Sequence, residues 1–188
     1  MHRLHSHTRL FALLASIALP FAAAQTRPVT AERIIAADIE PQNWLAHGRT
    51  YGEQRYSPLN QVNDGNVEKL GLAWSYATNS TRGLQATPIV VDGRMYATGV
   101  WSVVYALDAK TGRELWTYDP QVPREWGRYA CCDAVNRGVA LWQDALYFAT
   151  LDGRLISLDA RTGKQRWVIN TIDRTKPYTI TGAPRVIK

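Results

Sequence analysis

The sequence predicts an all-β protein assembled from repeated small sheets. The string YALDAKTGRELW (Tyr105–Trp116) recurs as ISLDARTGKQRW (Ile156–Trp167) at an offset of 51 residues, without a gap. Asp-Gly pairs separate β-rich runs, as in TPIVVDGRMYAT, and helical periodicity is not sustained anywhere after the first 24 residues. A repeat near this length, made of short strands and tight turns, is typical of a β-propeller, in which each blade is a small antiparallel sheet.

Residues 1–24 have the layout of a secretory signal peptide. Arg3 and Arg9 give a basic start, an apolar run covers Leu10–Phe21, and small residues end at Ala24. The apolar run is short for a bilayer span, so cleavage near Ala24 is favoured over an uncleaved anchor. We therefore expect a periplasmic protein, with no other indication of membrane association.

Charge and histidine content exclude two classes of site. Residues 1–24 hold two of the 22 Lys and Arg and none of the 16 Asp and Glu, so the remainder carries +4. Its basic residues form no run of five or more, which argues against a nucleic-acid partner. Without the leader, His47 is the only histidine, so a histidine-rich metal site is excluded. Export also favours an oxidising compartment, where a disulfide persists.

Residues 25–188 begin with one short helix and continue as strands. The helix is expected across Thr30–Asp38. Tight hairpins are expected at Asp92-Gly93 and Asp152-Gly153, because these dipeptides separate β-rich runs. In each copy of the repeat, Asp, Thr and Gly stand between a strand ending in Leu and one ending in Trp, which predicts a further turn.

Recurring tryptophans and aspartates in the repeat are expected to be structural. Trp116 and Trp167 close the two copies, and Trp74 stands more loosely in the same place. A large flat side chain at one fixed position of each blade can pack between neighbouring sheets. Asp108 and Asp159 are expected to accept backbone hydrogen bonds within their turns, rather than to bind metal.

The chain is too short for a complete propeller. A propeller has about four to eight blades, and repeat architectures need about three units to bury their faces. After the leader, the sequence supplies about two blades and a lead-in, and its end stops inside an apolar strand pattern. We expect residues 25–188 to be the N-terminal part of a truncated propeller domain, the rest lying beyond Lys188.

The only two cysteines, Cys131 and Cys132, are adjacent in RYACCDAVNRG. Adjacent α-carbons lie about 3.8 Å apart across a trans peptide, below the usual disulfide span of about 4.4 to 6.8 Å. Such a bond would close a small strained ring, and loop closure would explain little of its value. A metal or nucleophile site is disfavoured, because no CxxC pair or nearby histidine accompanies the pair. Buried free thiols and a rigid vicinal disulfide that serves a ligand both remain open.

The surroundings of the cysteines are similar to a known family. The chain resembles the N-terminal part of the pyrroloquinoline quinone (PQQ)-dependent alcohol dehydrogenases, which are eight-bladed propellers. The resemblance covers nearly everything after about residue 42. Its stretches are EQRYSPLNQVNDGNVEKLGLAW, ATPIVVDGRMYATG, VYALDAKTGRELWTYDPQVPREWGRYACCDAVNRGVA, LDGRLISLDARTGKQRW and NTIDRTKPYTITGAPRV. LDAxTGxxxW repeats occur in other propellers too, whereas CCDxVNRG in this setting is specific.

The resemblance implies a set of cofactor-binding residues. Cys131 and Cys132 would form a vicinal disulfide lying flat against the planar quinone. Arg137 would pair with quinone oxygens, which suits a guanidinium facing a tricarboxylate. Thr181, in TGAP, would hydrogen-bond a cofactor carboxylate. Gln85 stands where most members carry a glutamate, so it keeps hydrogen-bonding capacity but brings no negative charge.

The resemblance also implies the reaction. Members oxidise primary alcohols to aldehydes with PQQ and calcium and pass electrons to a cytochrome c. The catalytic aspartate and the calcium ligands come from later blades, so no catalytic residue and no metal ligand is assigned here, and the fragment alone is expected to be inactive. Some relatives carry a C-terminal haem c. This chain has no C-x-x-C-H motif, so its sequence neither supports nor excludes a haem c in a longer parent protein. The alternative function is a non-enzymatic exported propeller scaffold of the outer-membrane-assembly type, which has no need of CCDAVNRG.

Overall fold

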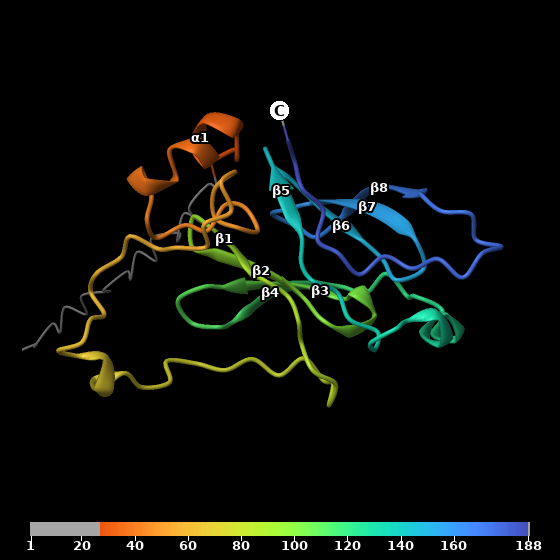
Figure 1. Ribbon diagram of the computed structural model, residues 1–188, viewed down its shortest axis with the longest axis horizontal. Coiled ribbons are helices and arrows are strands. Elements are labelled where there is room, and N and C mark those ends of the chain that lie inside the picture. Colours follow the sequence, from red (N-terminus) through yellow and green to blue (C-terminus); the bar gives the residue numbers. More distant parts are fainter. Residues whose placement is uncertain (1–26, 188) are drawn as a thin grey trace, which may run out of the picture.

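A computed structural model describes residues 27–187, and these form two four-stranded antiparallel sheets (Figure 1). The predicted leader, residues 1–24, lies outside the described residues. The first sheet has the order β1-β2-β3-β4 and the second β5-β6-β7-β8, so every strand pairs with its sequence neighbour. The strands are β1 (Ile89–Val91), β2 (Arg94–Thr98), β3 (Val104–Asp108), β4 (Glu114–Tyr118), β5 (Ala140–Trp142), β6 (Ala145–Ala149), β7 (Arg154–Asp159) and β8 (Gln165–Asn170). The two sheets are two blades, which confirms the predicted all-β class.

The internal repeat is reproduced in the strand register. Tyr96 on β2 lies opposite Ile89, and Tyr147 on β6 lies opposite Ala140. Each sheet also has a register shift at the same repeat position, after Ala106 on β3 and after Ser157 on β7. The sequence repeat is therefore a repeat of structure down to the position of the β-bulge.

The predicted turns are formed by the residues that predicted them. Asp92 and Gly93 join β1 to β2 with φ of 47° and 80°, the left-handed values that a tight hairpin requires. Gly153, φ 80°, turns the chain between β6 and β7. The Asp108 carboxylate accepts hydrogen bonds from the backbone N–H of Thr111 at 2.9 Å and from its hydroxyl. These bonds lower the pKa of Asp108 and confirm its role in the turn.

A tryptophan covers the glycine turn at the outer edge of each sheet. The indole Nε1 of Trp116, on β4, donates to the Ala160 carbonyl at 3.1 Å, and the ring covers the turn at Gly163. Trp74 does the same to the first sheet, where its ring covers Gly112. Both glycines have positive φ and leave no room for a Cβ beneath the indole. The predicted packing between blades is thus confirmed for Trp116, and Trp74 covers the matching turn of the first sheet.

The outermost strand of the second sheet has no such neighbour among the described residues. Every residue of β8 is exposed, and Trp167 is 39% exposed. By contrast, four of the five residues of β3 are buried, because sheet or loop covers both of its faces.

Two hydrophobic clusters organise the interior. The larger lies between the sheets and the N-terminal segment and includes Ile34, Leu45, Tyr96, Phe148 and Ile156. A separate cluster of Val122, Trp126, Ala134 and Leu151 lies under the connection from β4 to β5. That connection contains η4 (Arg124–Tyr129), and a second short 3₁₀ helix, η3 (Val100–Ser102), links β2 to β3.

The N-terminal segment is attached to the first hairpin. It contains α1 (Ala31–Ile35) and η1 (Ala37–Ile39), which confirms the predicted helix. The Thr30 hydroxyl caps α1 by accepting a hydrogen bond from the backbone N–H of Arg33. The Arg33 guanidinium pairs with Glu40 at 2.7 Å and with Asp92 of the β1–β2 turn. Figure 1 shows α1 beside the β1 end of the first sheet.

Between this segment and the first sheet, the chain runs through η2 (Val67–Lys69) and passes under β4 before it reaches β1 (Figure 1). Within residues 27–187, no helix is both long and apolar enough for a membrane span.

Candidate functional site

Three chain segments that lie far apart in the sequence meet where the inner strands begin. Thr87 lies just before β1, Arg137 lies just before β5, and Thr181 follows the second sheet. The backbone N–H of Arg137 donates to the Thr181 carbonyl at 2.9 Å, and that of Thr87 donates to the Arg137 carbonyl at 3.2 Å. Arg137 is therefore the central member of a three-segment junction.

The Arg137 side chain is directed onto the third segment as well. Its Nη1 donates to the Thr181 hydroxyl at 2.6 Å, and both residues are half-buried. One of the five guanidinium N–H donors is thus occupied, and no carboxylate within residues 27–187 forms an ion pair with Arg137. The structure brings together Arg137 and Thr181, which were both predicted as site residues.

Small and polar neighbours make the junction tight. Gly138 has φ 131°, and a Cβ there would lie 3.0 Å from the Thr87 carbonyl oxygen, so only glycine fits without displacement. Asn136 is 2% exposed, and its Nδ2 donates to the Ala149 carbonyl at 2.7 Å while its Oδ1 accepts from the Gly138 N–H. The buried amide holds the chain in place one residue before Arg137.

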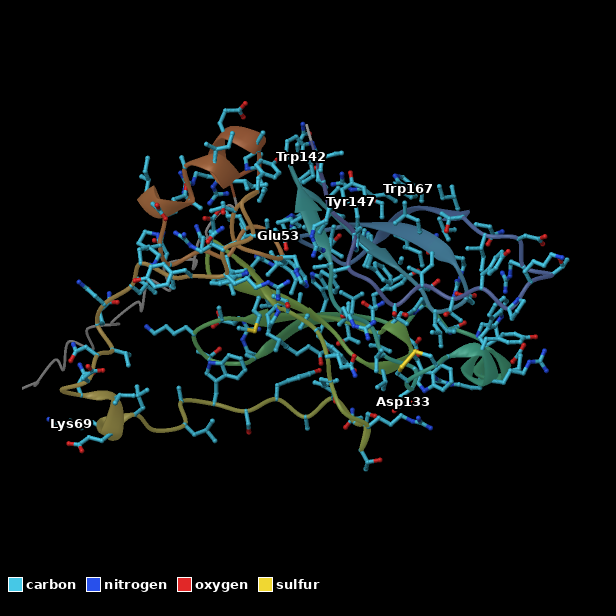
Figure 2. All side chains as sticks on the ribbon, viewed as in Figure 1. Glu53, Lys69, Asp133, Trp142, Tyr147 and Trp167 are labelled. Atoms are coloured by element: carbon cyan, nitrogen blue, oxygen red, sulfur yellow. A yellow bond between two sulfur atoms is a disulfide. The ribbon has the colours of Figure 1, made fainter. Side chains whose placement is uncertain are left out.

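Cys131 and Cys132 are joined by a disulfide, with their Cα atoms 3.8 Å apart. Both residues are exposed, and no free cysteine occurs in the described chain, so the alternative of buried free thiols is wrong. The bond follows η4 and precedes Asp133, beside which Figure 2 shows it in yellow. The Asp133 carboxylate pairs with Arg82, from the segment before β1. The disulfide thus presents an accessible, conformationally restricted surface five residues before Arg137.

Gln85 is exposed, and its side chain forms no hydrogen bond within the described part of the chain. It lies two residues before Thr87, whose backbone is part of the junction. Gln85 is therefore close to the junction in sequence, and its amide has no hydrogen-bond partner within residues 27–187.

The segment that carries Thr181 is anchored at its far end. Arg185 donates from Nε to Glu53 at 2.7 Å, and its Nη2 lies 2.9 Å from His47 Nδ1 (Figure 2 labels Glu53). The hydrogen bond from Arg185 lowers the pKa of Glu53. Burial, together with the positive charges of Arg185 and Arg55, lowers the pKa of His47 and favours its neutral form. The third segment is thus tied to the N-terminal region.

The junction and the disulfide offer different kinds of ligand contact. The Arg137 guanidinium offers planar donors to carboxylates, the Thr181 hydroxyl can donate or accept, and the disulfide offers a firm apolar face. Within residues 27–187, no group of three or more His, Cys, Asp or Glu could hold a metal ion.

Sequence reasoning did not identify Trp101, which contacts the disulfide-bearing connection from the β2–β3 side. Its backbone lies in the left-handed region, φ 58° and ψ 23°. The string GVWSVV contains no Asn, Asp or Gly at this position to signal that conformation.

Comparison with known proteins matches this chain to one family and to individual relatives. Residues 44–178 match the PQQ family model, described as glucose/ethanol/alcohol dehydrogenase, beta-propeller domain. The quinohemoprotein alcohol dehydrogenase ADH-IIG of Pseudomonas putida is 58% identical over 179 residues, covering 94% of this chain and 25% of that protein. The 1-butanol dehydrogenase (cytochrome c) of Thauera butanivorans is 60% identical over 146 residues, covering 77% of this chain and 21% of the other.

The fold is also found in a solved structure. The P. putida ADH-IIG structure superposes with a TM-score of 0.85 at 59% identity, covering 87% of this chain and 24% of that one. The chain thus spans about a quarter of the length of the relatives that it matches.

Proposed function

Because the chain belongs to the PQQ family of glucose, ethanol and alcohol dehydrogenases, we propose that it supplies the disulfide-bearing side of the cofactor site in an enzyme that oxidises primary alcohols to aldehydes. The observation that carries the proposal is the adjacent-cysteine disulfide placed five residues before an arginine whose guanidinium binds Thr181. A non-enzymatic scaffold propeller has no need of either feature, which argues against that alternative.

The described residues fit a planar tricarboxylate. The exposed disulfide face would contact the quinone plane, and it brings no charge that would repel an anion. The free donors of Arg137 would bind a cofactor carboxylate or carbonyl oxygen, and the Thr181 hydroxyl would bind another carboxylate. Gln85 would contribute a neutral amide where a glutamate is usual, so the site is more tolerant of the negative charge of the cofactor.

PQQ, when bound with calcium, would supply the hydride acceptor for alcohol oxidation, and calcium would supply a Lewis acid. The role of this chain in that reaction is to bind and orient. Arg137 is held through its backbone at both N–H and C=O, so its guanidinium is positioned before any ligand arrives. The catalytic base and the calcium ligands are expected outside residues 1–188, so the chain alone should not oxidise alcohol.

We further propose that the enzyme acts in the periplasm and delivers its electrons to a cytochrome c. The signal-peptide pattern of residues 1–24 supports export. The name of the Thauera relative includes cytochrome c, and several relatives are quinohemoproteins, which supports a haem protein as electron acceptor or a haem c in a longer parent protein.

The test is a hybrid enzyme in which residues 44–187 of this chain, which include Thr181, replace the matching segment of P. putida ADH-IIG. With added PQQ and calcium, the hybrid should reduce an electron-accepting dye when a primary alcohol is supplied. The matched control is the same hybrid with Cys131→Ser and Cys132→Ser, which should bind PQQ at least 10-fold more weakly. A folded hybrid that binds no PQQ would contradict the proposed function.

A further inference from the structure

The disulfide lies on a loop, and loops are the most mobile part of most folds. We call residues 124–134 the platform loop; it contains η4 and the Cys131–Cys132 disulfide. A surface that supports a planar ligand has to keep one height and one tilt. Something outside the platform loop must therefore restrain it on both sides of the two cysteines.

Trp101 has an unusual backbone for a bulky residue. Its φ is 58° and ψ is 23°, and the next residue, Ser102, has φ 61°. A non-glycine residue in this region costs about 1 to 3 kcal/mol and persists only where the surrounding structure enforces it. Because the backbone here would favour glycine or asparagine, the contacts of the tryptophan must enforce this conformation.

Those contacts bracket the disulfide. The Trp101 N–H donates to the Ala134 carbonyl at 2.8 Å, two residues after Cys132. The far edge of the indole lies against Gly127, four residues before Cys131, where a Cβ would come within 2.9 Å of Cη2. The Arg124 guanidinium lies 4.4 Å from the centre of the ring, in cation–π contact at the start of the platform loop. A single residue of the first blade thus contacts the start, middle and end of the loop.

The second blade restrains the platform loop from its other side. Trp126, 6% exposed on η4, packs in the small cluster with Leu151, and the Leu151 N–H donates to the Ser102 hydroxyl at 3.2 Å. The guanidinium of Arg174 lies 5.7 Å from the Trp126 ring and is 3.5 Å from the buried carboxylate of Asp152. The turn that contains Trp101 is therefore tied to both blades and cannot shift by itself.

We propose that Trp101 is a positioning residue that holds the Cys131–Cys132 disulfide at a fixed height and tilt. The proposal rests on the proposed function in one respect, that the disulfide is the surface against which PQQ binds. Trp101 acts through the platform loop, by contacts on both sides of the cysteines, and no contact between its ring and the cofactor is implied.

The test compares two tryptophan variants of the full chain by ¹⁵N relaxation. Trp101→Asn removes the ring but keeps a residue that tolerates left-handed φ. Trp142→Ala removes a half-buried ring on β5 that packs on the main core. Figure 2 shows Trp142 at the opposite edge of the molecule from Asp133, which follows the disulfide. Both variants lose aromatic packing, but only the first touches the platform loop.

The expected result is local loosening. Backbone order parameters of Cys131, Cys132 and Asp133 should fall from about 0.85, typical of a rigid backbone, to below about 0.6 in Trp101→Asn, and should stay unchanged in Trp142→Ala. Unchanged order parameters in a folded Trp101→Asn chain would overturn the proposal. Gly127→Ala is the second variant, because its Cβ would press on the indole from the loop side. It should shift the amide resonances of both cysteines, and unshifted resonances would also overturn the assignment.

PQQ affinity of the hybrid enzyme separates the two proposals. Trp101→Asn in the hybrid should weaken PQQ binding about 10-fold or more, and Trp101→Phe, which restores part of the ring, should recover some of the loss. A loosened loop with unchanged PQQ affinity would overturn the positioning role. If the hybrid without these substitutions binds no PQQ, the proposed function fails, whereas the order parameters still report on the loop.

Discussion

At the level of single residues, Arg137 stabilises the fold through its backbone and leaves most of its guanidinium donors available to a ligand. Its backbone N–H and C=O hold the segments at Thr181 and Thr87 together, and one guanidinium nitrogen binds the Thr181 hydroxyl. The remaining guanidinium donors form no ion pair within residues 27–187. The same residue can therefore stabilise the junction and keep a charged, oriented group for an anion.

Replacing Arg137 with Lys should separate these two roles. The backbone hydrogen bonds remain, so the free energy of unfolding should change little. The planar fork of donors is lost, and hydrogen bonds to charged groups contribute about 1.5 to 3 kcal/mol, so PQQ affinity of the hybrid enzyme should fall roughly 10- to 100-fold. Calorimetric titration with PQQ measures the change. The matched control is Arg113→Lys, an exposed arginine in the β3–β4 turn, and an equal loss in the control would refute the assignment.

At the level of elements, the two sheets are joined by a tryptophan that covers a glycine turn. Gly163 has φ 72°, and a Cβ there would lie 2.7 Å from the Trp116 ring. Gly93, in the β1–β2 turn, has φ 80°, and a Cβ there would have no neighbouring atom within 4 Å. The two glycines therefore share a backbone requirement and differ in whether a neighbouring blade covers them.

The pair allows the interblade contact to be measured. Left-handed φ costs about 1 to 2 kcal/mol for alanine at either site. Gly163→Ala should cost a further 1 to 3 kcal/mol or so, because the methyl group displaces the indole. Urea unfolding of both variants gives the difference. The additional cost should disappear when Gly163→Ala is combined with Trp116→Ala; if it remains, the indole is not its cause.

Ion pairs attach the N-terminal segment to the first hairpin. The Glu40 side chain is 14% exposed and pairs with Arg33, which also reaches Asp92. The hydrogen bond from Arg33 holds the pKa of Glu40 at about 2, below its usual 4.5, although burial opposes the shift. Since the folded-state pKa is depressed, the carboxylate stabilises the fold fully above pH 4.5, and this contribution is lost as the pH falls toward 2.

Glu40→Gln should therefore destabilise the chain in a pH-dependent way. At pH 7 the variant should lose about 1 to 3 kcal/mol, because a charged hydrogen-bonded partner of Arg33 is removed. The difference from the unmodified chain should shrink between pH 4.5 and the acid limit of folding. Urea midpoints from pH 7 to pH 3 give the profile, with Glu68→Gln, exposed on η2, as control. A difference that does not depend on pH would show that the charge of Glu40 is irrelevant.

At the level of the whole molecule, the repetition of the blade brings the segments at Thr87, Arg137 and Thr181 together. The segments that lead into β1 and β5 and the segment after β8 converge because blades repeat with the same order from inner to outer strand. Residues 44 positions apart, such as Arg137 and Thr181, meet for this reason. A site shared by successive blades is what a propeller architecture makes available.

The whole chain should be exported and shortened when it is expressed in a Gram-negative host. The basic start and short apolar run of residues 1–24 favour cleavage near Ala24. Intact-mass measurement of periplasmic protein should then show an N-terminus at or next to Gln25. Replacing Leu13 and Leu14 with Arg, which interrupts the apolar run, should keep the protein in the cytoplasm with Met1 or His2 at its N-terminus. Equal export of both forms would contradict the predicted leader.

Much of the fold could be predicted from the repeat. Strands, tight turns and the structural role of Trp116 all follow from patterns a few residues long, since alternation, Asp-Gly pairs and the Thr-Gly turn act locally. The identity of the candidate site residues came instead from the resemblance of CCDAVNRG and its surroundings to a known family, and not from local preferences. The adjacency of Cys131 and Cys132 restricts the explanation of that motif to a few alternatives.

The rest depended on packing between distant segments. The hydrogen bond from Arg137 to Thr181, the attachment of Arg33 to Asp92 and the contacts of Trp101 with the platform loop each join parts of the chain that no local pattern relates. The left-handed backbone of Trp101 is imposed by its surroundings against its own preference, so the residue type could not predict it. Short-range preferences therefore specified the blades, whereas the arrangement of the site followed from how the blades pack together.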